Sequence, residues 1–212
     1  MEALENLLER FPVLGPCRAA IAAAATAMVA CLEADGAVFT CGNGGSAADA
    51  EHIVGELLKG FIHPRPLPEG DRQRLRELDP ADGALLAERL QCGFRAFCLM
   101  SQTAIATAVG NDLGEALAPA QQLYGLGRSG DVLIALSTSG NARNAVLATQ
   151  VARLRGMTTI ALTGAGGGRL ATLAEVAIRV PAEQTYQVQE LHLPVYHALC
   201  IAVENHFFPP RA

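Results

Sequence analysis

The sequence has no tryptophan, few other aromatic residues and few charged ones. Aromatic residues make up 5% and charged residues 17% of the 212 positions, whereas 50% are hydrophobic. A chain this long and this apolar can bury a sizeable core, which excludes an intrinsically disordered protein. Because domains average roughly 150 residues, we expect a single domain over residues 1–212 with added segments.

Positive charge is also in short supply. The 16 Lys and Arg residues against 21 Asp and Glu residues give a formal net charge of −5. We therefore expect neither nucleic acid nor an anionic membrane surface as a partner. The apolar stretch at 19–32 is shorter than the roughly 20 residues of a bilayer span, and the acidic start is unlike a signal peptide, so we expect a cytoplasmic protein.

The six cysteines form no CxxC pair and are too scattered for a disulfide framework. They stand at positions 17, 31, 41, 92, 98 and 200, mostly within apolar runs. We interpret them as small hydrophobic residues of the core.

Short apolar runs alternate with Gly- or Ser-rich loops and helical segments. The runs are at 37–41, 94–100, 131–136, 158–163 and 175–180. Continuous apolar strands that alternate with helices predict an α/β fold with a doubly wound parallel sheet flanked by helices. Folds of this kind bind ligands at the carboxyl ends of their strands.

Two segments lie outside this alternation. An N-terminal helical region at about 1–35, with Pro16 in its first turn, is apolar on nearly all sides, so we expect it to pack in an oligomer. A charged segment at about 66–91 predicts two short helices, one that starts near Asp71 and one capped by Asp79. We interpret it as an insertion beside the site or a lid.

Two loops at strand ends carry ligand-binding signals. The loop Cys41–Ser46 is rich in glycine, and Ser46 with Asp49 three residues later is typical of a capping box. Residues 137–139 present three hydroxyl groups before a helix, a composition that suits a phosphate. The alternative interpretation is that both loops are ordinary strand-to-helix turns with a capping residue.

Candidate acid–base or metal-binding side chains follow on two helices. His52 and Glu56 are four residues apart and share a helix face, although a surface pair is an alternative. In the last helix, Gln189 and His197 are two turns apart, and core or interface positions are the alternative. Pro194 between them predicts a bend or break before His197.

Five segments are similar, in the same order and spacing, to the sugar isomerase (SIS) domain family and, within it, to the phosphoheptose isomerases. They are GNGGSAADAEHIVGEL, VGNDLG, GDVLIALSTSGNARNAV, GMTTIALTGAGGG and IRVPAEQTYQVQELHLPVYH. The resemblance implies interconversion of sedoheptulose 7-phosphate and D-glycero-D-manno-heptose 7-phosphate through an enediol. It further implies a homotetramer with active sites shared between subunits.

The resemblance also implies roles for individual residues. Glu56 and His197 would be the catalytic pair, Glu56 taking the carbon-bound proton and His197 moving the oxygen-bound one. Zinc would be held by His52, Glu56, Gln189 and His197. Substrate contacts would come from Asn43, Gly44, Gly45, Asn111, Asp112, Ser137, Thr138, Ser139 and Gln189, with the three hydroxyl residues on the phosphate.

Two features depart from the family pattern, and two other functions remain open. Ala142 stands where the phosphate loop of the family usually has a serine, and the segment at about 66–91 is longer than is typical. The alternatives are a non-catalytic SIS-domain scaffold of the replication-initiator-associating type and an isomerase of another phosphosugar. Glu56 and His197, which such scaffolds lack, favour the enzyme.

Overall fold

The computed structural model describes residues 2–79 and 81–209 and contains a five-stranded parallel sheet. The strand order is β2-β1-β3-β4-β5, which confirms the predicted doubly wound α/β fold. Each predicted apolar run contains one strand. Their bounds are β1 Val38–Cys41, β2 Ala96–Cys98, β3 Val132–Leu136, β4 Thr158–Thr163 and β5 Val176–Arg179.

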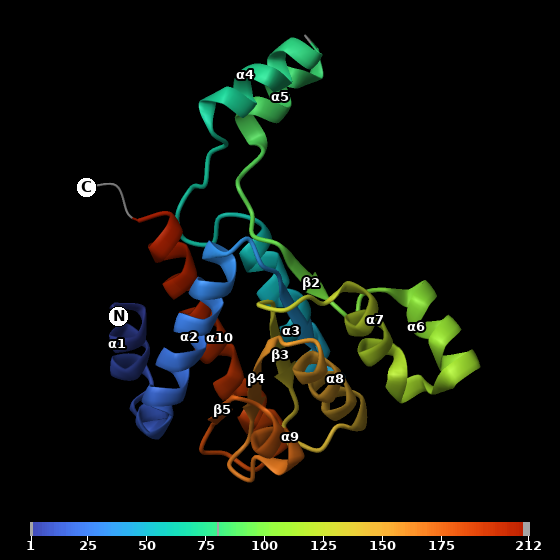
Figure 1. Ribbon diagram of the computed structural model, residues 1–212. Coiled ribbons are helices and arrows are strands. Elements are labelled where there is room, and N and C mark those ends of the chain that lie inside the picture. The colour runs from blue at the N-terminus through green and yellow to red at the C-terminus, as the bar shows by residue number, and fades with distance from the viewer. Residues whose placement is uncertain (1, 80, 210–212) are drawn as a thin grey trace.

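Helices cover both faces of the sheet (Figure 1). One face is covered by α2 (Arg18–Glu33), α3 (Gly45–Leu58) and α10 (Thr185–Phe207), with α1 (Glu2–Arg10) packed outside α2 and α10. The other face is covered by α7 (Ala118–Leu126), α8 (Arg143–Leu154) and α9 (Gly168–Leu173). The shorter elements are η1 Pro12–Cys17, α4 Glu69–Leu78, α5 Asp82–Arg89, α6 Thr103–Val109, the π-helix η2 Gly110–Gly114 and η3 Glu115–Leu117.

The core consists of two apolar layers, one on each side of the sheet. Every residue of β3 is buried, because its side chains alternate between the two layers. This explains why the strands read as unbroken apolar runs in the sequence.

The N-terminal helical region consists of α1, η1 and α2. Pro16 lies in η1 rather than in the first turn of α2, and Asp35 ends the region with a φ of 57°. The segment Pro12–Glu33, with 22 residues and a mean hydropathy of 1.6, is long and apolar enough to cross a membrane, contrary to the estimate from residues 19–32. One such helix is weak evidence of a span, since core helices meet the same criterion; here α2 packs on α10 and β5.

The charged segment forms a helical hairpin that projects from the body of the protein (Figure 1). Its helices α4 and α5 pack chiefly against each other. An isolated antiparallel bridge between Pro66 and Gln91 closes its base. Asp79 accepts hydrogen bonds from the Ala81 and Asp82 amides at 2.7 and 3.1 Å, as the predicted cap requires.

The last helix, α10, runs without interruption through Pro194. Pro194 therefore does not break the helix before His197, whereas the predicted bend there stays a prediction. The missing backbone bond at one position is outweighed by burial of this stretch, in which Val195, Tyr196 and Leu199 are at most 1% exposed.

Candidate active site

The two ligand-binding loops flank the point at which the strand order reverses. From β1 the chain crosses outward to β2, whereas β3, on the other side of β1, continues to β4 and β5. In open parallel sheets such a switch point leaves a crevice outside the carboxyl ends of the strands. The glycine loop after β1 and the hydroxyl-rich loop after β3 both end at this crevice.

The glycine loop turns directly into α3. Gly44 is the N-cap residue and has a φ of 54°, a conformation that glycine adopts without strain. No side chain caps the helix, so the predicted capping box of Ser46 and Asp49 is wrong. Ser46 is buried, and the Asp49 carboxylate instead reaches across to α10, where it accepts a hydrogen bond from Tyr196.

Hydrogen bonds to its own serine hydroxyl groups stabilise the second loop, residues 137–141. Ser137 Oγ accepts a hydrogen bond from the Ala142 amide at 3.3 Å, and Ser139 Oγ accepts one from the Asn141 amide at 3.2 Å. Each hydroxyl oxygen thus serves the loop as an acceptor, while its proton is available for donation to an anion. Gly140, with a φ of 68°, ends the turn before α8. Thr138 lies between the two serines and is half-buried.

A cavity of about 440 Å³ opens beside these loops. Its lining includes Asn111, on the π-helix η2, and Asn144, in the first turn of α8. The Asn144 and Asn43 carboxamides exchange two hydrogen bonds of 2.8 Å, which tie the glycine loop to the cavity wall. Asn111 donates a hydrogen bond to the neighbouring Asp112 at 2.7 Å. Polar groups from three elements therefore converge at this end of the sheet.

The second group of predicted residues lies along the seam between α3 and α10. His52 Nε2 is 3.1 Å from Glu56 Oε1, and the ring centroids of His52 and His197 are 5.1 Å apart. The Glu56 side chain is 12% exposed, and Lys59 Nζ donates to its other oxygen at 3.1 Å. The structure thus brings the predicted catalytic pair, Glu56 and His197, together with His52.

The environment of this group favours neutral imidazole at His197. Burial and the neighbouring His52 lower the pKa of His197 and outweigh the opposite effect of Glu56. Its Nε2 atom is buried and has no hydrogen-bond partner among the described residues. A neutral ring with a free nitrogen can accept a proton or bind a metal ion.

Gln189 lies at the other end of the seam. Its carboxamide packs against Gly45, where a Cβ atom would come within 2.6 Å of its nitrogen. Gly45 is about two turns before His52 on α3. The structure therefore places Gln189 closer to the glycine loop than to the other three predicted zinc ligands.

The donor types of the seam suit zinc, which prefers imidazole nitrogen and carboxylate oxygen. The partnerless Nε2 of His197 agrees with a ligand role. Over residues 2–79 and 81–209, however, no three His, Cys, Asp or Glu side chains form a ready-made group for a metal ion. A zinc site would accordingly require side-chain rotation.

A buried ion pair fixes the end of α3 that carries Glu56. Arg65 and Glu204 are both fully buried, with Nε and Oε1 2.8 Å apart. Arg65 also donates to the Glu56 and Leu57 carbonyl oxygens, which lie in the last turn of α3. Burial alone would raise the pKa of Glu204. The hydrogen bonds from the Phe61 and Ile62 amides and from Arg65 have a larger, opposite effect, so the pKa lies below its ordinary value.

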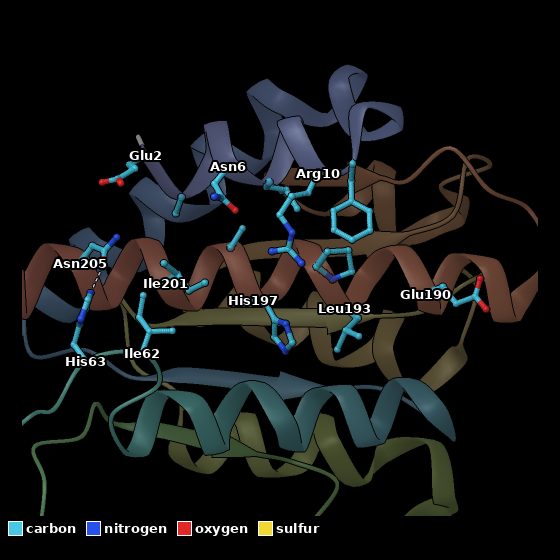
Figure 2. A pocket seen from close by; sticks show the side chains of 15 residues that line it. Glu2, Asn6, Arg10, Ile62, His63, Glu190, Leu193, His197, Ile201 and Asn205 are labelled. Carbon is cyan, nitrogen blue, oxygen red and sulfur yellow. Dashed lines mark hydrogen bonds between the residues drawn. The ribbon is translucent and has the colours of Figure 1, made fainter. Parts of the chain in front are cut away.

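A second cavity, of about 390 Å³, lies between α1 and α10 (Figure 2). Figure 2 shows Arg10 approaching α10 from α1, whereas His197 points from α10 toward α3. The lining contains His197 but no residue of the two loops at the strand ends. This cavity and the crevice are thus separate hollows.

Sequence reasoning missed four residues of the site. Asn144 lies in the first turn of α8. It is the second asparagine after the hydroxyl residues 137–139, and this position was the signal in the sequence that could have identified it. Tyr196, Arg65 and Glu204 gave no local signal, because their partners are 139 to 147 residues away in the chain.

The model of the SIS domain matches residues 2–72 and 84–164. The chain therefore belongs to the SIS-domain family. The match leaves out residues 73–83 and also residues 165–212, which include Gln189 and His197.

Similar proteins narrow the family to one branch. The chain is 44% identical to phosphoheptose isomerase from Rhodospirillum rubrum over 193 residues, 91% of this chain and 88% of the relative. It is 40% identical to that of Akkermansia muciniphila, over 84% of this chain and 80% of the relative. These matches place the chain in the phosphoheptose isomerase branch.

Solved structures agree with this placement. The phosphoheptose isomerase of Francisella tularensis superposes with a TM-score of 0.73 at 30% identity, covering 95% of this chain and 94% of that one. That of Neisseria gonorrhoeae gives a TM-score of 0.68 at 32% identity, covering 94% and 98%.

Proposed function

We propose that this protein is an aldose–ketose isomerase that interconverts sedoheptulose 7-phosphate and D-glycero-D-manno-heptose 7-phosphate. The observation that carries the proposal is the convergence of Glu56, His52 and His197 on the α3–α10 seam, in a chain that also has a hydroxyl-rich loop at the sheet crevice. The names of the relatives support a phosphorylated heptose as the substrate.

Residues of the crevice would bind the phosphate and the sugar chain. Ser137, Thr138 and Ser139 present hydroxyl donors, and the amino end of α8 adds a positive dipole. The remaining proposed substrate contacts are Asn43, Gly44, Gly45, Asn111, Asp112 and Gln189. This arrangement would bind a dianion by directed hydrogen bonds.

The seam would carry out the proton transfer between C1 and C2. Glu56 accepts the carbon-bound proton of the open-chain sugar, and its carboxylate returns that proton to the neighbouring carbon. His197, held neutral by burial, moves the proton between the two substrate oxygens. The enediol forms and collapses without a net change in oxidation state of the sugar, since one carbon is oxidised as its neighbour is reduced.

The active site is proposed to be completed in a homotetramer. Ser46 and Glu56 are ten residues apart on α3, so roughly 15 Å of helix separates the glycine loop from the catalytic carboxylate within one subunit. A seam supplied by one subunit and a crevice supplied by another would shorten that path. Light scattering on the purified chain should give a tetrameric mass, and a monomeric mass at micromolar concentration would exclude shared sites.

Zinc is a proposed cofactor, held by His52, Glu56 and His197. Gln189, the fourth ligand that the resemblance implies, lies nearer the glycine loop and would have to move to reach the same ion. When bound, it would polarise the substrate carbonyl as a Lewis acid. The metal content of the purified protein, measured by atomic absorption, should fall in His52→Ala. It should be unchanged in His206→Ala, since His206 pairs with Glu33 near the end of α10. Equal metal content in both variants would exclude the site.

We propose the cytoplasm as the compartment of this protein. All six cysteines are free thiols, a condition that the reducing cytoplasm maintains.

The test of the function is conversion of sedoheptulose 7-phosphate followed by proton NMR. Wild type should form the aldoheptose anomeric signal, and Glu56→Gln should lower kcat by at least about 100-fold, the contribution of a general base. Glu51→Gln is the matched control, because Glu51 lies on the same helix and is exposed. Retention of turnover in Glu56→Gln at saturating substrate would refute the role of the base.

A further inference from the structure

Three consecutive carbonyl oxygens of the hydroxyl-rich loop, residues 137–141, are engaged within the protein. They accept one hydrogen bond each: Thr138 O from the Gly164 amide at 2.9 Å, Ser139 O from Asn141 Nδ2 at 3.1 Å and Gly140 O from the Leu170 amide at 2.9 Å. Two of the donors lie in the segment after β4, residues 164–170. This segment fits closely against the loop, since a Cβ atom at Gly168 would overlap the Ser139 carbonyl oxygen.

Two amide groups of the loop have no such partner. In the part of the chain that the structure describes, the Thr138 and Ser139 amides donate to no protein group. A trans peptide unit directs its C=O and N–H groups to opposite sides, so the Ser139 amide points away from the segment that binds Thr138 O. The loop therefore presents N–H and hydroxyl groups, rather than carbonyl oxygens, to an anion in the crevice.

The Asn141 side chain connects this loop to α9. Its Nδ2 donates to Ser139 O, and its Oδ1 accepts a hydrogen bond from the Arg169 amide, in the first turn of α9, at 3.0 Å. Because the Arg169 amide only donates and the Ser139 carbonyl only accepts, the orientation of the carboxamide is determined by its two partners. Asn141 thus fixes the peptide group that follows Ser139.

We propose that Asn141 is a positioning residue of the phosphate site and acts through Ser139. Without Asn141 Nδ2, the Ser139 carbonyl oxygen loses its partner and can rotate toward the crevice, where its partial negative charge repels a phosphate. Asn141 is exposed, so its effect on the ligand does not come from packing in the core. The inference rests on the proposed function, because that function places the phosphate at this loop.

Calorimetric titration with inorganic phosphate measures the effect without the reaction. Asn141→Ala should raise the Kd for phosphate about 10-fold, the equivalent of one hydrogen bond to a charged group. Gln150→Ala is the matched control, since it removes an exposed carboxamide from the neighbouring helix α8 and should leave Kd unchanged. The variants are compared at a temperature at which circular dichroism shows them folded, so that a purely structural effect changes Tm but not Kd.

Kinetics with sedoheptulose 7-phosphate separate binding from chemistry. Asn141→Ala should raise KM by a factor similar to that in Kd and leave kcat within about twofold, since Glu56 and His197 belong to the seam and not to the loop.

A double-mutant cycle tests whether the effect passes through Ser139. If it does, Asn141→Ala combined with Ser139→Ala should raise Kd by less than the product of the two single effects.

Three results would overturn the proposal: no binding of phosphate by wild type, an unchanged Kd in Asn141→Ala, or a double variant in which Kd rises by the full product. An unchanged Kd in Asn141→Ala, in a protein that converts the heptose phosphate, would refute the role of Asn141 and leave the proposed function intact. The expected Kd values in a protein that does not convert the sugar would support Asn141 as a positioning residue and refute the proposed function alone.

Discussion

Replacement of Glu204 by alanine should destabilise the protein more than loss of any exposed ion pair. Glu204 accepts hydrogen bonds from the Phe61, Ile62 and His63 amides at 2.7, 2.7 and 3.0 Å, and from Arg65 at 2.8 Å. In the variant the Arg65 guanidinium stays buried beside an empty volume without its counter-charge.

The magnitude follows from the burial of both partners. Removal of one member of a buried ion pair costs about 3–5 kcal/mol in free energy of unfolding. For a chain of this length each kcal/mol lowers Tm by about 2–4 °C, so the expected decrease is about 6–20 °C. Glu204→Gln should lose less, because its amide oxygen still accepts from the loop amides.

The assay is thermal unfolding followed by circular dichroism, with a urea titration to obtain the free energy of unfolding. Glu5→Ala is the control, since it removes an ion pair with Arg18 in which both side chains are about half exposed. Exposed pairs contribute little, so this Tm should hardly change. Equal Tm values for Glu204→Ala and Glu5→Ala would refute the argument from burial.

Three further predictions concern single positions. Ala142→Ser adds a hydroxyl at the N-cap of α8, so it should stabilise the protein by about 0.5–2 kcal/mol, measured as a higher Tm. It should also lower KM for the phosphosugar, and an unchanged KM would show that the phosphate does not contact this turn. Gly140→Ala should lower Tm and raise KM, because its Cβ would overlap the Gly167 carbonyl oxygen at a φ of 68°. Gly55→Ala, in open space on α3, should raise Tm slightly, and the reverse order would contradict the loop geometry. Burial lowers the pKa of His192 to about 4, so the unfolded chain binds the additional proton first, and stability should fall with decreasing pH between about 6.5 and 4. His192→Gln should flatten that part of the pH profile in urea titrations, and an identical slope would show that His192 does not titrate there.

The sheet could be predicted from the sequence because each strand is a local apolar run of the right length. All five runs, including Thr158–Thr163 with unchanged bounds, contain strands. The loops at the strand ends were also recognisable, since glycine and hydroxyl residues mark turns wherever they occur.

The polar contacts between α3 and α10 could not be predicted in this way. Asp49 has the spacing of a capping box with Ser46, and that local pattern hides its actual partner, Tyr196, 147 residues later. A local motif competes with any long-range contact for the same side chain, and only the packing of the two helices decides between them. The same limit applies to Arg65 and Glu204.

The projecting hairpin is a place where the chain can change in length while the rest of the fold stays the same. The bridge between Pro66 and Gln91 keeps the two ends of the segment adjacent, so residues can be gained or lost beyond it without moving α3 or β2. The entropic cost of closing a loop rises only with the logarithm of its length, so residues added beyond the bridge destabilise the fold little. Such a position is where insertions can accumulate over evolution, and where a reporter domain can be grafted while the sheet keeps its register.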